Sequence, residues 1–503
     1  MCFPESSGAE IVLPYIFSDG AVLQRDVRVA IWGTASPGSR ISVRFRDSTA
    51  EAHANAQGTW STSLPPMPAV AEPADLRIAS SDANDAPKAI ANVLVGDVWL
   101  CSGQSNMFWP LGKTGEYPGV EEGEAAIASP PDPLLHLLCD DKHPLWDGRG
   151  WQEATPDARR PFSGVAYFFG ERLRRELNVP IGLINISRGG TPVQRWTPPA
   201  YAERVPLTRR FNALFIQERA RIDAYNRQLA DRERAVRARR PLPPAPTTLP
   251  ADLMIARSFY GAGAYERFVT PIIPYTLRGV IWYQGESNSG ELQVAQRYAE
   301  MFKALVDGWR DAWGRPELSF YFVQLPSWDP GEFWPWTRQA QLAASRSVPH
   351  CDMVVSVDVG DAGDRANLHP PKKRTIGDRL AAAALARSYG RPIVWTGPAI
   401  SELRSDGERV ILTFDPAGGV PRAKDGSWRD VELAGADHAF HPATVTLSGN
   451  RATVQCEAVT APRAVRYGWR ATLSPTLFND SALPASPFHY VCDEAGRWSL
   501  YVP

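Results

Sequence analysis

The chain has 503 residues, which suggests two or three domains, because a single hydrophobic core rarely grows beyond about 300 residues. Its formal net charge is −1 with both signs mixed, so it shows no electrostatic footprint for nucleic acid, and its ordinary composition excludes disordered and fibrous classes. No apolar run approaches the ~20 residues that a membrane span needs.

Cysteine usage and the start of the chain bear on the cellular compartment. The six cysteines include no Cys-x-x-Cys pair, which disfavours a zinc site and thioredoxin-type chemistry. Cys456 and Cys492 share the C-terminal region and are a candidate disulfide. Residues 1–10 lack the basic start and the apolar stretch of a signal peptide. We nevertheless expect a periplasmic or secreted location in preference to a cytoplasmic one.

The pattern of elements divides the chain into three parts. Residues 1–92 predict a β-sandwich segment, since short alternating runs are separated by glycine, proline and asparagine. Residues 93–396 alternate strands (93–101, 181–186, 279–283, 318–325 and 353–357) with helices (165–177, 292–313, 337–347 and 375–389). This alternation implies a parallel sheet covered on both faces. Residues 397–503 return to short strands, which we expect to pack with the N-terminal β segment.

Residues 200–250 predict a helical and proline-rich insertion within the middle part. Six apolar residues fall on one helical face, with arginines around the rest: Phe211, Leu214, Phe215, Ile222, Tyr225 and Leu229. The proline-rich stretch 241–246 ends the helix. The density of charge favours a solvated surface insertion, with a lid over a site as the alternative.

Polar segments lie beside four of these elements. Ser102-Gly103-Gln104-Ser105-Asn106-Met107 follows the apolar run 93–101, Ser187-Arg188-Gly189-Gly190-Thr191 follows 181–186, Gln284-Gly285-Glu286-Ser287-Asn288 follows 279–283, and Asn367-Leu368-His369 precedes the helix at 375–389. Ligands of open α/β folds bind outside the carboxyl ends of the strands. Together these segments offer a nucleophile, a base and donors for an oxyanion, which is the set that acyl transfer needs.

The segments closely resemble those of the sialate O-acetylesterase family of SGNH hydrolases, also called the SASA type. The matching stretches are 96–107, Gly189-Gly190-Thr191 with Trp196, 279–288, Leu368-His369-Pro370 with Lys373, and 483–488. The resemblance runs from about Leu13 to Phe488. It implies the α/β class, with an SGNH-hydrolase-like doubly wound parallel sheet as the catalytic domain at 93–396. The N- and C-terminal regions would supply accessory β-sandwich (jelly-roll-like) structure, and no cofactor or metal would be needed.

The resemblance implies that Ser105 is the nucleophile and His369 the general base. Chemistry agrees, because a serine hydroxyl needs a neighbouring imidazole to remove its proton near neutral pH. The oxyanion hole would use the backbone N–H groups of Ser105 and Gly190 together with the side-chain amide of Gln284, or alternatively that of Asn288.

The sequence departs from the family pattern at the third member of the triad. Relatives usually have an acid two or three residues before the histidine, where this chain has Asn367 and Ala366. Asp364 is the expected orienter of the imidazole, with Asp361 or Asn367 as alternatives, and a Ser-His dyad also stays open. Gln194 is a second departure, because relatives often have a glutamate at this place.

Several residues beside the motifs could line a sugar site, although packing is an equal alternative for each: Trp109, Gln194, Arg195, Trp196, Trp282 and Glu286. The expected partner is an O-acetylated carbohydrate substrate, with no nucleic acid and no membrane. The oligomeric state is left open.

The sequence therefore predicts a serine carbohydrate O-acetylesterase that releases acetate through an acetyl-enzyme. The substrate would be an acetylated plant polysaccharide or oligosaccharide, such as xyloglucan or xylan, or O-acetylated sialic acid. One alternative is a catalytically impaired carbohydrate-binding protein on an SGNH scaffold. Another is a lipase-like esterase for long acyl chains, which would need an apolar acyl tunnel.

Overall fold

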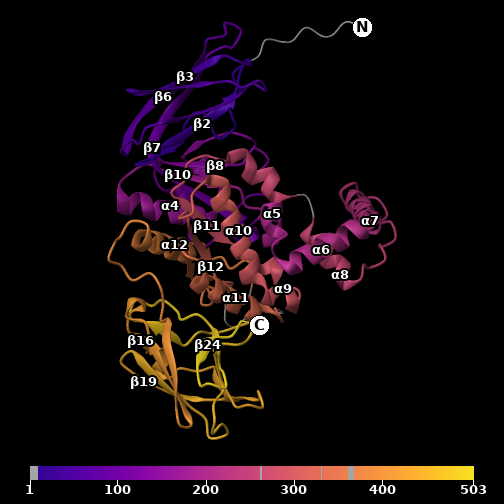
Figure 1. Cartoon of the computed structure of the whole chain (residues 1–503), viewed down its shortest axis with the longest axis vertical. Coiled ribbons are helices and arrows are strands. Elements are labelled where there is room, and N and C mark those ends of the chain that lie inside the picture. The colour runs from indigo at the N-terminus through magenta and orange to yellow at the C-terminus, as the bar shows by residue number, and fades with distance from the viewer. Residues whose placement is uncertain (1–9, 261–262, 330, 361–366, 503) are drawn as a thin grey trace.

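Three structural regions follow one another along the longest axis of the molecule. The structure, a computed structural model, describes residues 10–260, 263–329, 331–360 and 367–502. Figure 1 shows the N-terminal β region at one end, an α/β layer in the middle and the C-terminal β region at the other end. This arrangement differs from the expected contact between the two β regions, because each packs against its own end of the α/β layer. None of the described helices is both long and apolar enough to cross a bilayer.

The N-terminal β region continues directly into the central sheet through one long strand. Strand β7 (Lys88–Gly103) has 16 residues. Its first part pairs with β6 in antiparallel fashion, and its last part pairs in parallel with β10 and β11. The expected boundary at residue 92 therefore falls inside a strand. The other strands of this region are β1 (Val22–Gln24), β2 (Val29–Thr34), β3 (Arg40–Phe45), β4 (Ser48–His53), β5 (Thr59–Leu64) and β6 (Val70–Ser80).

The central sheet places β7 at a topological switch point. Its strand order is β13-β12-β11-β7-β10-β8-β9, in which every neighbouring pair from β13 to β8 is parallel and β9 is antiparallel. These strands are β8 (Asp132–Cys139), β9 (Gln152–Ala154), β10 (Ile181–Asn185), β11 (Gly279–Tyr283), β12 (Ser319–Val323) and β13 (Cys351–Val354). The next strands in the chain, β8, β9 and β10, lie on one side of β7, and β11, β12 and β13 lie on the other, so a ligand site is expected beyond its carboxyl end.

Helices cover both faces of this sheet and make two separate cores. Ile281 and Tyr283 of β11 face the core that α4 and α12 cover, whereas Val280 and Trp282 face the core on the side of α10 and α11. Because both faces are covered, the central strands are apolar throughout instead of alternating. The helices of the layer are α1 (Ser105–Phe108), α2 (Gly123–Ala128), α3 (Pro156–Arg159), α4 (Gly164–Leu177), α5 (Pro199–Ala202), α9 (Leu292–Gln296), α10 (Tyr298–Trp313), α11 (Trp334–Ser347) and α12 (Lys373–Arg387).

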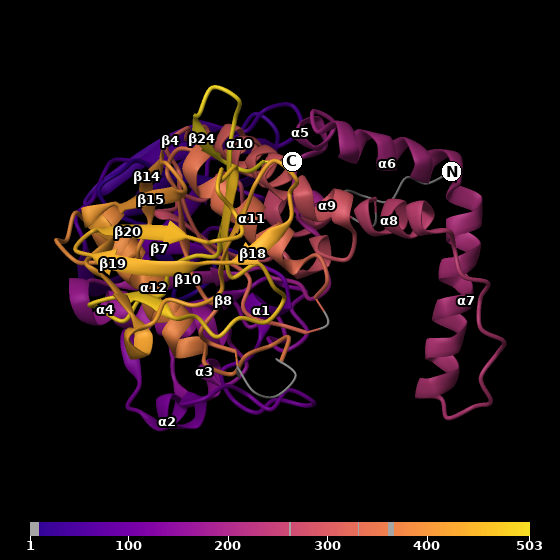
Figure 2. The ribbon, with the colours of Figure 1, turned by 90° about the horizontal axis from the view of Figure 1, so that it is seen from below.

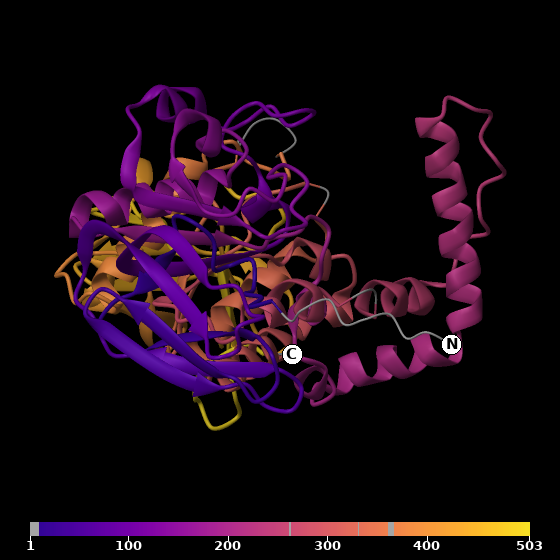
Figure 3. The same cartoon turned by 90° about the horizontal axis from the view of Figure 1, so that it is seen from above.

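The predicted insertion forms a helical arm. We define the arm as α6 (Pro206–Gln217), α7 (Arg219–Arg237), the stretch 238–250 and α8 (Ala251–Phe259). Figures 2 and 3 show α6 and α8 extending side by side from the body, with α7 running across their far ends. The apolar residues expected on one face of a single helix instead belong to two helices, α6 and α7, which meet at Glu218.

The C-terminal region is all β. A four-stranded sheet has the order β14-β15-β20-β19, a five-stranded sheet has the order β18-β17-β21-β23-β24, and β16 pairs with β22. The bounds are β14 (Ile400–Asp406), β15 (Arg409–Phe414), β16 (Pro421–Ala423), β17 (Val431–Ala434), β18 (Phe440–Pro442), β19 (Thr444–Ser448), β20 (Arg451–Gln455), β21 (Ala464–Tyr467), β22 (Leu477–Asn479), β23 (Phe488–Cys492) and β24 (Trp498–Leu500).

Helix α11 anchors this region to the central layer. The buried Arg338 donates to the carbonyl oxygens of Arg470 at 3.0 Å and Ala471 at 2.9 Å. Cys456 and Cys492 are both free, so the candidate disulfide is not formed.

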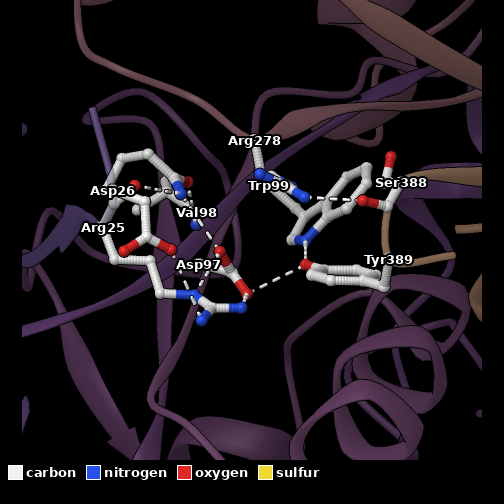
Figure 4. Close-up of polar contacts among 9 residues, drawn as sticks. Arg25, Asp26, Asp97, Val98, Trp99, Arg278, Ser388 and Tyr389 are labelled. Carbon is white, nitrogen blue, oxygen red and sulfur yellow. Dashed lines mark hydrogen bonds and ion pairs between the residues drawn. The ribbon is translucent and has the colours of Figure 1, made fainter. Parts of the chain in front are cut away.

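A buried carboxylate joins the N-terminal β region to the central sheet (Figure 4). Asp97 of β7 is fully buried and accepts two hydrogen bonds from Arg25, from Nε to Oδ1 and from Nη2 to Oδ2, each at 3.0 Å. Gln24 donates to Oδ1 at 3.0 Å, and the hydroxyl of Tyr389, just after α12, donates to Oδ2 at 2.9 Å. Four hydrogen bonds therefore compensate for the removal of this carboxylate from water.

We expect Asp97→Ala to lower the free energy of unfolding by about 3 kcal/mol, because it leaves the partly buried Arg25 and the hydroxyl of Tyr389 without their acceptor. Denaturant unfolding measures this change. Asp26→Ala is the matched control, since Asp26 also contacts Arg25, at 3.5 Å, but is exposed. Equal stability of the two variants would contradict the role given to Asp97.

Candidate active site

Ser105 stands directly beyond the end of β7. The turn that carries it requires glycine at position 103, where φ is +134° and an added Cβ would lie 2.1 Å from the carbonyl oxygen of Tyr283. The next backbone N–H, that of Gln104, donates to the same carbonyl at 2.9 Å. Ser105 then begins the short helix α1 and is half-buried. Close contact between the turn and the end of β11 thus determines where the hydroxyl lies.

His369 contacts this hydroxyl from the segment before α12. Its Nε2 lies 2.8 Å from the Oγ of Ser105, within hydrogen-bond distance. The indole of Trp109 stacks on the imidazole, with ring centroids 4.2 Å apart and planes 23° apart. Burial, together with the positive charge of Lys373, lowers the pKa of His369 to about 4. The ring is therefore neutral at neutral pH and can accept a proton at Nε2.

The third member of the triad would be the side chain that accepts a hydrogen bond from the Nδ1 of His369. Asp364 and Asp361 lie outside the described residues. Asn367 accepts a hydrogen bond at 2.9 Å from the backbone N–H of His369, so its side-chain oxygen is bonded to the backbone and not to the imidazole. Among the residues that the structure describes, no side chain bonds to the Nδ1 of His369.

The Gly-Gly turn after β10 lies beside the serine. A Cβ added at Gly189 would lie 3.6 Å from the Cβ of Ser105, so this glycine borders the space that an acyl group would occupy. Gly190 has φ of +68°, a conformation that favours glycine. The N–H of Arg188 donates to the carbonyl of Gly103 at 3.0 Å, and this bond joins the two turns.

Buried amides connect the Gly-Gly turn to the end of β11. The Nε2 of Gln284 lies 3.1 Å from Gln104 Oε1, 2.8 Å from Asn288 Oδ1 and 3.3 Å from the carbonyl oxygen of Thr191. Asn288 in turn accepts from the N–H of Val193 at 3.0 Å. Because an amide nitrogen has only two protons, both donors of Gln284 are already directed at protein acceptors.

A second buried network is centred on Asn106, the residue after Ser105. Asn106 donates to Glu286 and to the carbonyl oxygen of Leu368, the latter at 3.0 Å, and it accepts from Lys373. Burial lowers the pKa of Lys373 to about 7, an effect that Glu286 opposes, and burial raises the pKa of Glu286. Asn106, which directly follows Ser105, thus connects the serine turn to the segment that carries His369.

The structure separates the six residues predicted to bind sugar. Trp109 is half-buried against His369, and Arg195 is half-buried near the arm. Trp196 and Trp282 are fully buried and donate to Thr191 and Tyr298, so they are core residues and the expectation that they line a sugar site is wrong.

Gln194 and Glu286, which were also predicted to contact sugar, are buried. The side-chain oxygen of Gln194 accepts from Asn288 at 2.9 Å, and Glu286 belongs to the Asn106 network, which corrects its expected contact with sugar. Sequence reasoning gave no role to Asn106 and Lys373, although both lie in or beside the matched motifs. Within the described ranges, no group of three histidine, cysteine or acidic side chains is arranged to hold a metal ion.

Comparisons with known proteins agree with this geometry. A family model described as "Carbohydrate esterase, sialic acid-specific acetylesterase" matches residues 259–386. A carbohydrate acetylesterase from Xanthomonas citri is 32% identical, covers 95% of this chain and 99% of its own, and superposes with a TM-score of 0.77. This chain belongs to the sialic acid-specific acetylesterase family of carbohydrate esterases.

Curated members of this family match along nearly the whole chain. The sialate O-acetylesterase of Rattus norvegicus is 28% identical over 93% of this chain and 92% of its own length. The enzyme of the same name from Homo sapiens is 25% identical over 94% of this chain and 91% of its own. The protein is therefore a carboxylic ester hydrolase of the carbohydrate acetylesterase type. The expected SGNH-like α/β fold is confirmed.

We expect Lys373→Met to raise the pKa of His369, because the substitution removes a positive charge that disfavours the imidazolium. The imidazole of the variant will then gain its proton at a higher pH than that of the wild type. NMR titration of the histidine ring signals measures this, with His369→Gln used to assign the resonance. Lys372→Met is the control for a neighbouring lysine, and an unchanged pKa in Lys373→Met would refute the proposed charge effect.

Proposed function

We propose that the protein releases acetate from O-acetylated sugars by serine catalysis, with Ser105 as nucleophile and His369 as general base. The observation that carries this proposal is the 2.8 Å contact between Ser105 Oγ and His369 Nε2 beyond the switch-point strand β7. A neutral imidazole at this distance can take the hydroxyl proton as Oγ attacks a carbonyl carbon.

The proposed reaction has two halves. In the first, the Ser105 proton moves to His369 Nε2, Oγ bonds to the acetyl carbon, and the sugar oxygen leaves with that proton. In the second, His369 takes a proton from a water molecule as its oxygen attacks the acetyl carbon, and then passes that proton to Ser105 Oγ as the bond to the acetyl group breaks. Acetic acid leaves and loses its proton to the solvent as acetate. The stacked indole of Trp109 and the Asn106–Leu368 hydrogen bond support the imidazole during both transfers.

We propose the backbone N–H groups of Ser105 and Gly190 as donors to the oxyanion. The amides of Gln284 and Asn288, expected as a third donor, are engaged with Gln104, Thr191 and Gln194. We therefore assign them a positioning role, in which they hold the Gly190 turn against the end of β7.

Acetylated oligosaccharides or polysaccharides, such as those of xyloglucan or xylan, are the proposed substrates, with O-acetylated sialic acid as the alternative. The curated relatives named above are called sialate O-acetylesterases, whereas the Xanthomonas citri relative is called a carbohydrate acetylesterase. Because such glycans lie outside the cytoplasm, we extend the proposal to a periplasmic or secreted location, which cell fractionation checks.

Ser105→Ala is expected to abolish acetate release from acetylated xyloglucan oligosaccharides or from O-acetylated sialic acid, since it removes the oxygen that would accept the acetyl group. A serine-directed phosphonate should label the wild type at one site and leave the variant unlabelled. Ser287→Ala, a half-buried serine of the same site, is the control and should keep its activity. Absence of both acetate release and labelling in the wild type would instead support a carbohydrate-binding protein.

Asp364 is the proposed orienter of His369, with Asp361 as the alternative. We expect Asp364→Asn to lower kcat for acetate release by about 10²-fold or more, because a neutral side chain stabilises the imidazolium less than a carboxylate does. Steady-state kinetics of Asp364→Asn and Asp361→Asn, measured side by side, distinguishes the two. If neither substitution lowers kcat, the enzyme uses a Ser-His dyad.

A further inference from the structure

A cavity of about 480 Å³ lies where the arm joins the body. Its walls come from the 3₁₀ helix η1 (Val193–Trp196), from α5 and α6, and from the end of α8 together with Tyr260, Gly263 and Glu266. In Figure 2, α5, α6 and α8 lie together on the side of the body from which the arm extends. None of the residues assigned to acyl transfer lines this cavity.

One wall carries a buried hydroxyl that has nothing to bond. Thr208 of α6 is 1% exposed, and its Oγ1 has no hydrogen-bond partner among the described residues. Buried polar side-chain atoms almost always have a partner, and leaving one without a partner is costly. Thr208 lines the cavity, but its Oγ1 is shielded from the open space, so a polar ligand would satisfy this hydroxyl after rotation about the Cα–Cβ bond.

Arg195 brings a positive charge to the same cavity. Its Nε donates to the carbonyl oxygen of Ser258 at 2.9 Å, and no carboxylate among the described residues pairs with it. Burial and the neighbouring Arg257 both lower the pKa of Arg195, so the charge is only weakly compensated by the protein. The terminal nitrogens of the guanidinium therefore remain as donors for a ligand.

Acceptors and an aromatic ring complete the lining. Glu203, which accepts from Asn212 at 2.6 Å, and Glu266 supply carboxylate oxygens. Tyr260 is 42% exposed, and one face of its ring stacks on Phe215 with centroids 4.2 Å apart. The cavity is thus lined by a positively charged donor and by negatively charged acceptors. This combination suits a neutral, hydroxyl-rich group better than an anion, because a hydroxyl both donates and accepts.

The cavity is close to Ser105 along the chain. Gly189 borders the serine, and Arg195 follows six residues later, so their Cα atoms are at most about 22 Å apart. Gln194, which also lines the cavity, accepts from Asn288 of the buried amide network beside the Gly-Gly turn. A glycan of a few sugar units would span this separation.

We propose that this cavity is a glycan subsite, which binds a further neutral sugar unit of the oligosaccharide whose acetyl group is at Ser105. The inference rests on the proposed function and deepens it, because it makes an oligosaccharide or polysaccharide the substrate in preference to a free sugar. The ligand contacts are Thr208 and Arg195 as hydrogen-bond donors, Glu203 and Glu266 as acceptors, and the exposed face of Tyr260 as a stacking surface.

The test compares an acetylated xyloglucan oligosaccharide with a methyl O-acetylglucoside. The wild type should have the higher kcat/KM for the oligosaccharide, and Tyr260→Ala and Thr208→Val should remove about fivefold or more of that advantage, chiefly through KM. Thr208→Val should leave the free energy of unfolding unchanged or raise it, because it replaces an unsatisfied buried hydroxyl by a methyl group. Equal losses on both substrates, or no loss on the oligosaccharide, would overturn the proposal.

Binding provides a second measurement that does not depend on catalysis. Calorimetry with deacetylated xyloglucan, xylan and sialyl oligosaccharides should detect binding of at least one of the two neutral glycans, weakened about tenfold by Arg195→Met. Binding of the sialyl oligosaccharide alone would contradict a subsite for a neutral sugar. Arg221→Met, an exposed arginine on α7 away from the cavity, is the matched control. Binding of none of them, or equal binding by the two arginine variants, overturns the subsite. Failure of acetate release alone, with binding intact, would instead refute the proposed esterase mechanism.

Discussion

The continuity of strand β7 is the constraint on which the rest of the structure depends. The strand pairs with β6 in the N-terminal region, then with β10 and β11 in the central sheet, and ends where Gly103 touches the carbonyl of Tyr283. The Asp97 carboxylate, with its four hydrogen bonds, lies at the start of the second pairing, opposite Ile181 of β10. Because a strand is stiff, anchoring it at Asp97 and at Gly103 leaves little freedom in the position of Ser105.

Two buried polar networks hold the segments around that serine. Gln284 and Asn288 join the Gly-Gly turn to the end of β11, and Asn106 joins Ser105 to the segment of His369. Buried amides are costly unless they are bonded, so each network stabilises one arrangement and penalises the others. Ser105 and His369, the proposed catalytic pair, are therefore held by neighbours that need not contact the substrate, and Lys373 of the second network also lowers the pKa of the imidazole.

Strand ends and motifs could be predicted from the sequence, whereas distances between elements could not. Periodicity and β-branched residues placed β11 at 279–283, as observed, and the motif around His369 predicted its contact with Ser105. Position beside a matched motif suggested that Glu286 could line a sugar site, whereas its burial depends on Asn106 and Lys373, which are distant in the chain. Likewise, the burial of Trp282 depends on packing by α10, and the opposite placement of the two β regions depends on which end of the sheet each one covers.

The long strand also bears on how this architecture can be inherited. A protein built from separable modules can exchange them by recombination at linkers, where few contacts cross. Here strand β7 pairs with β6 on one side and with β1 on the other as it leaves the N-terminal region. A recombination crossover near residue 92 would therefore cut this strand in two. The N-terminal region and the central sheet therefore cannot be exchanged separately at this point without breaking β7, whereas the arm extends from the side of the body as its own group of helices.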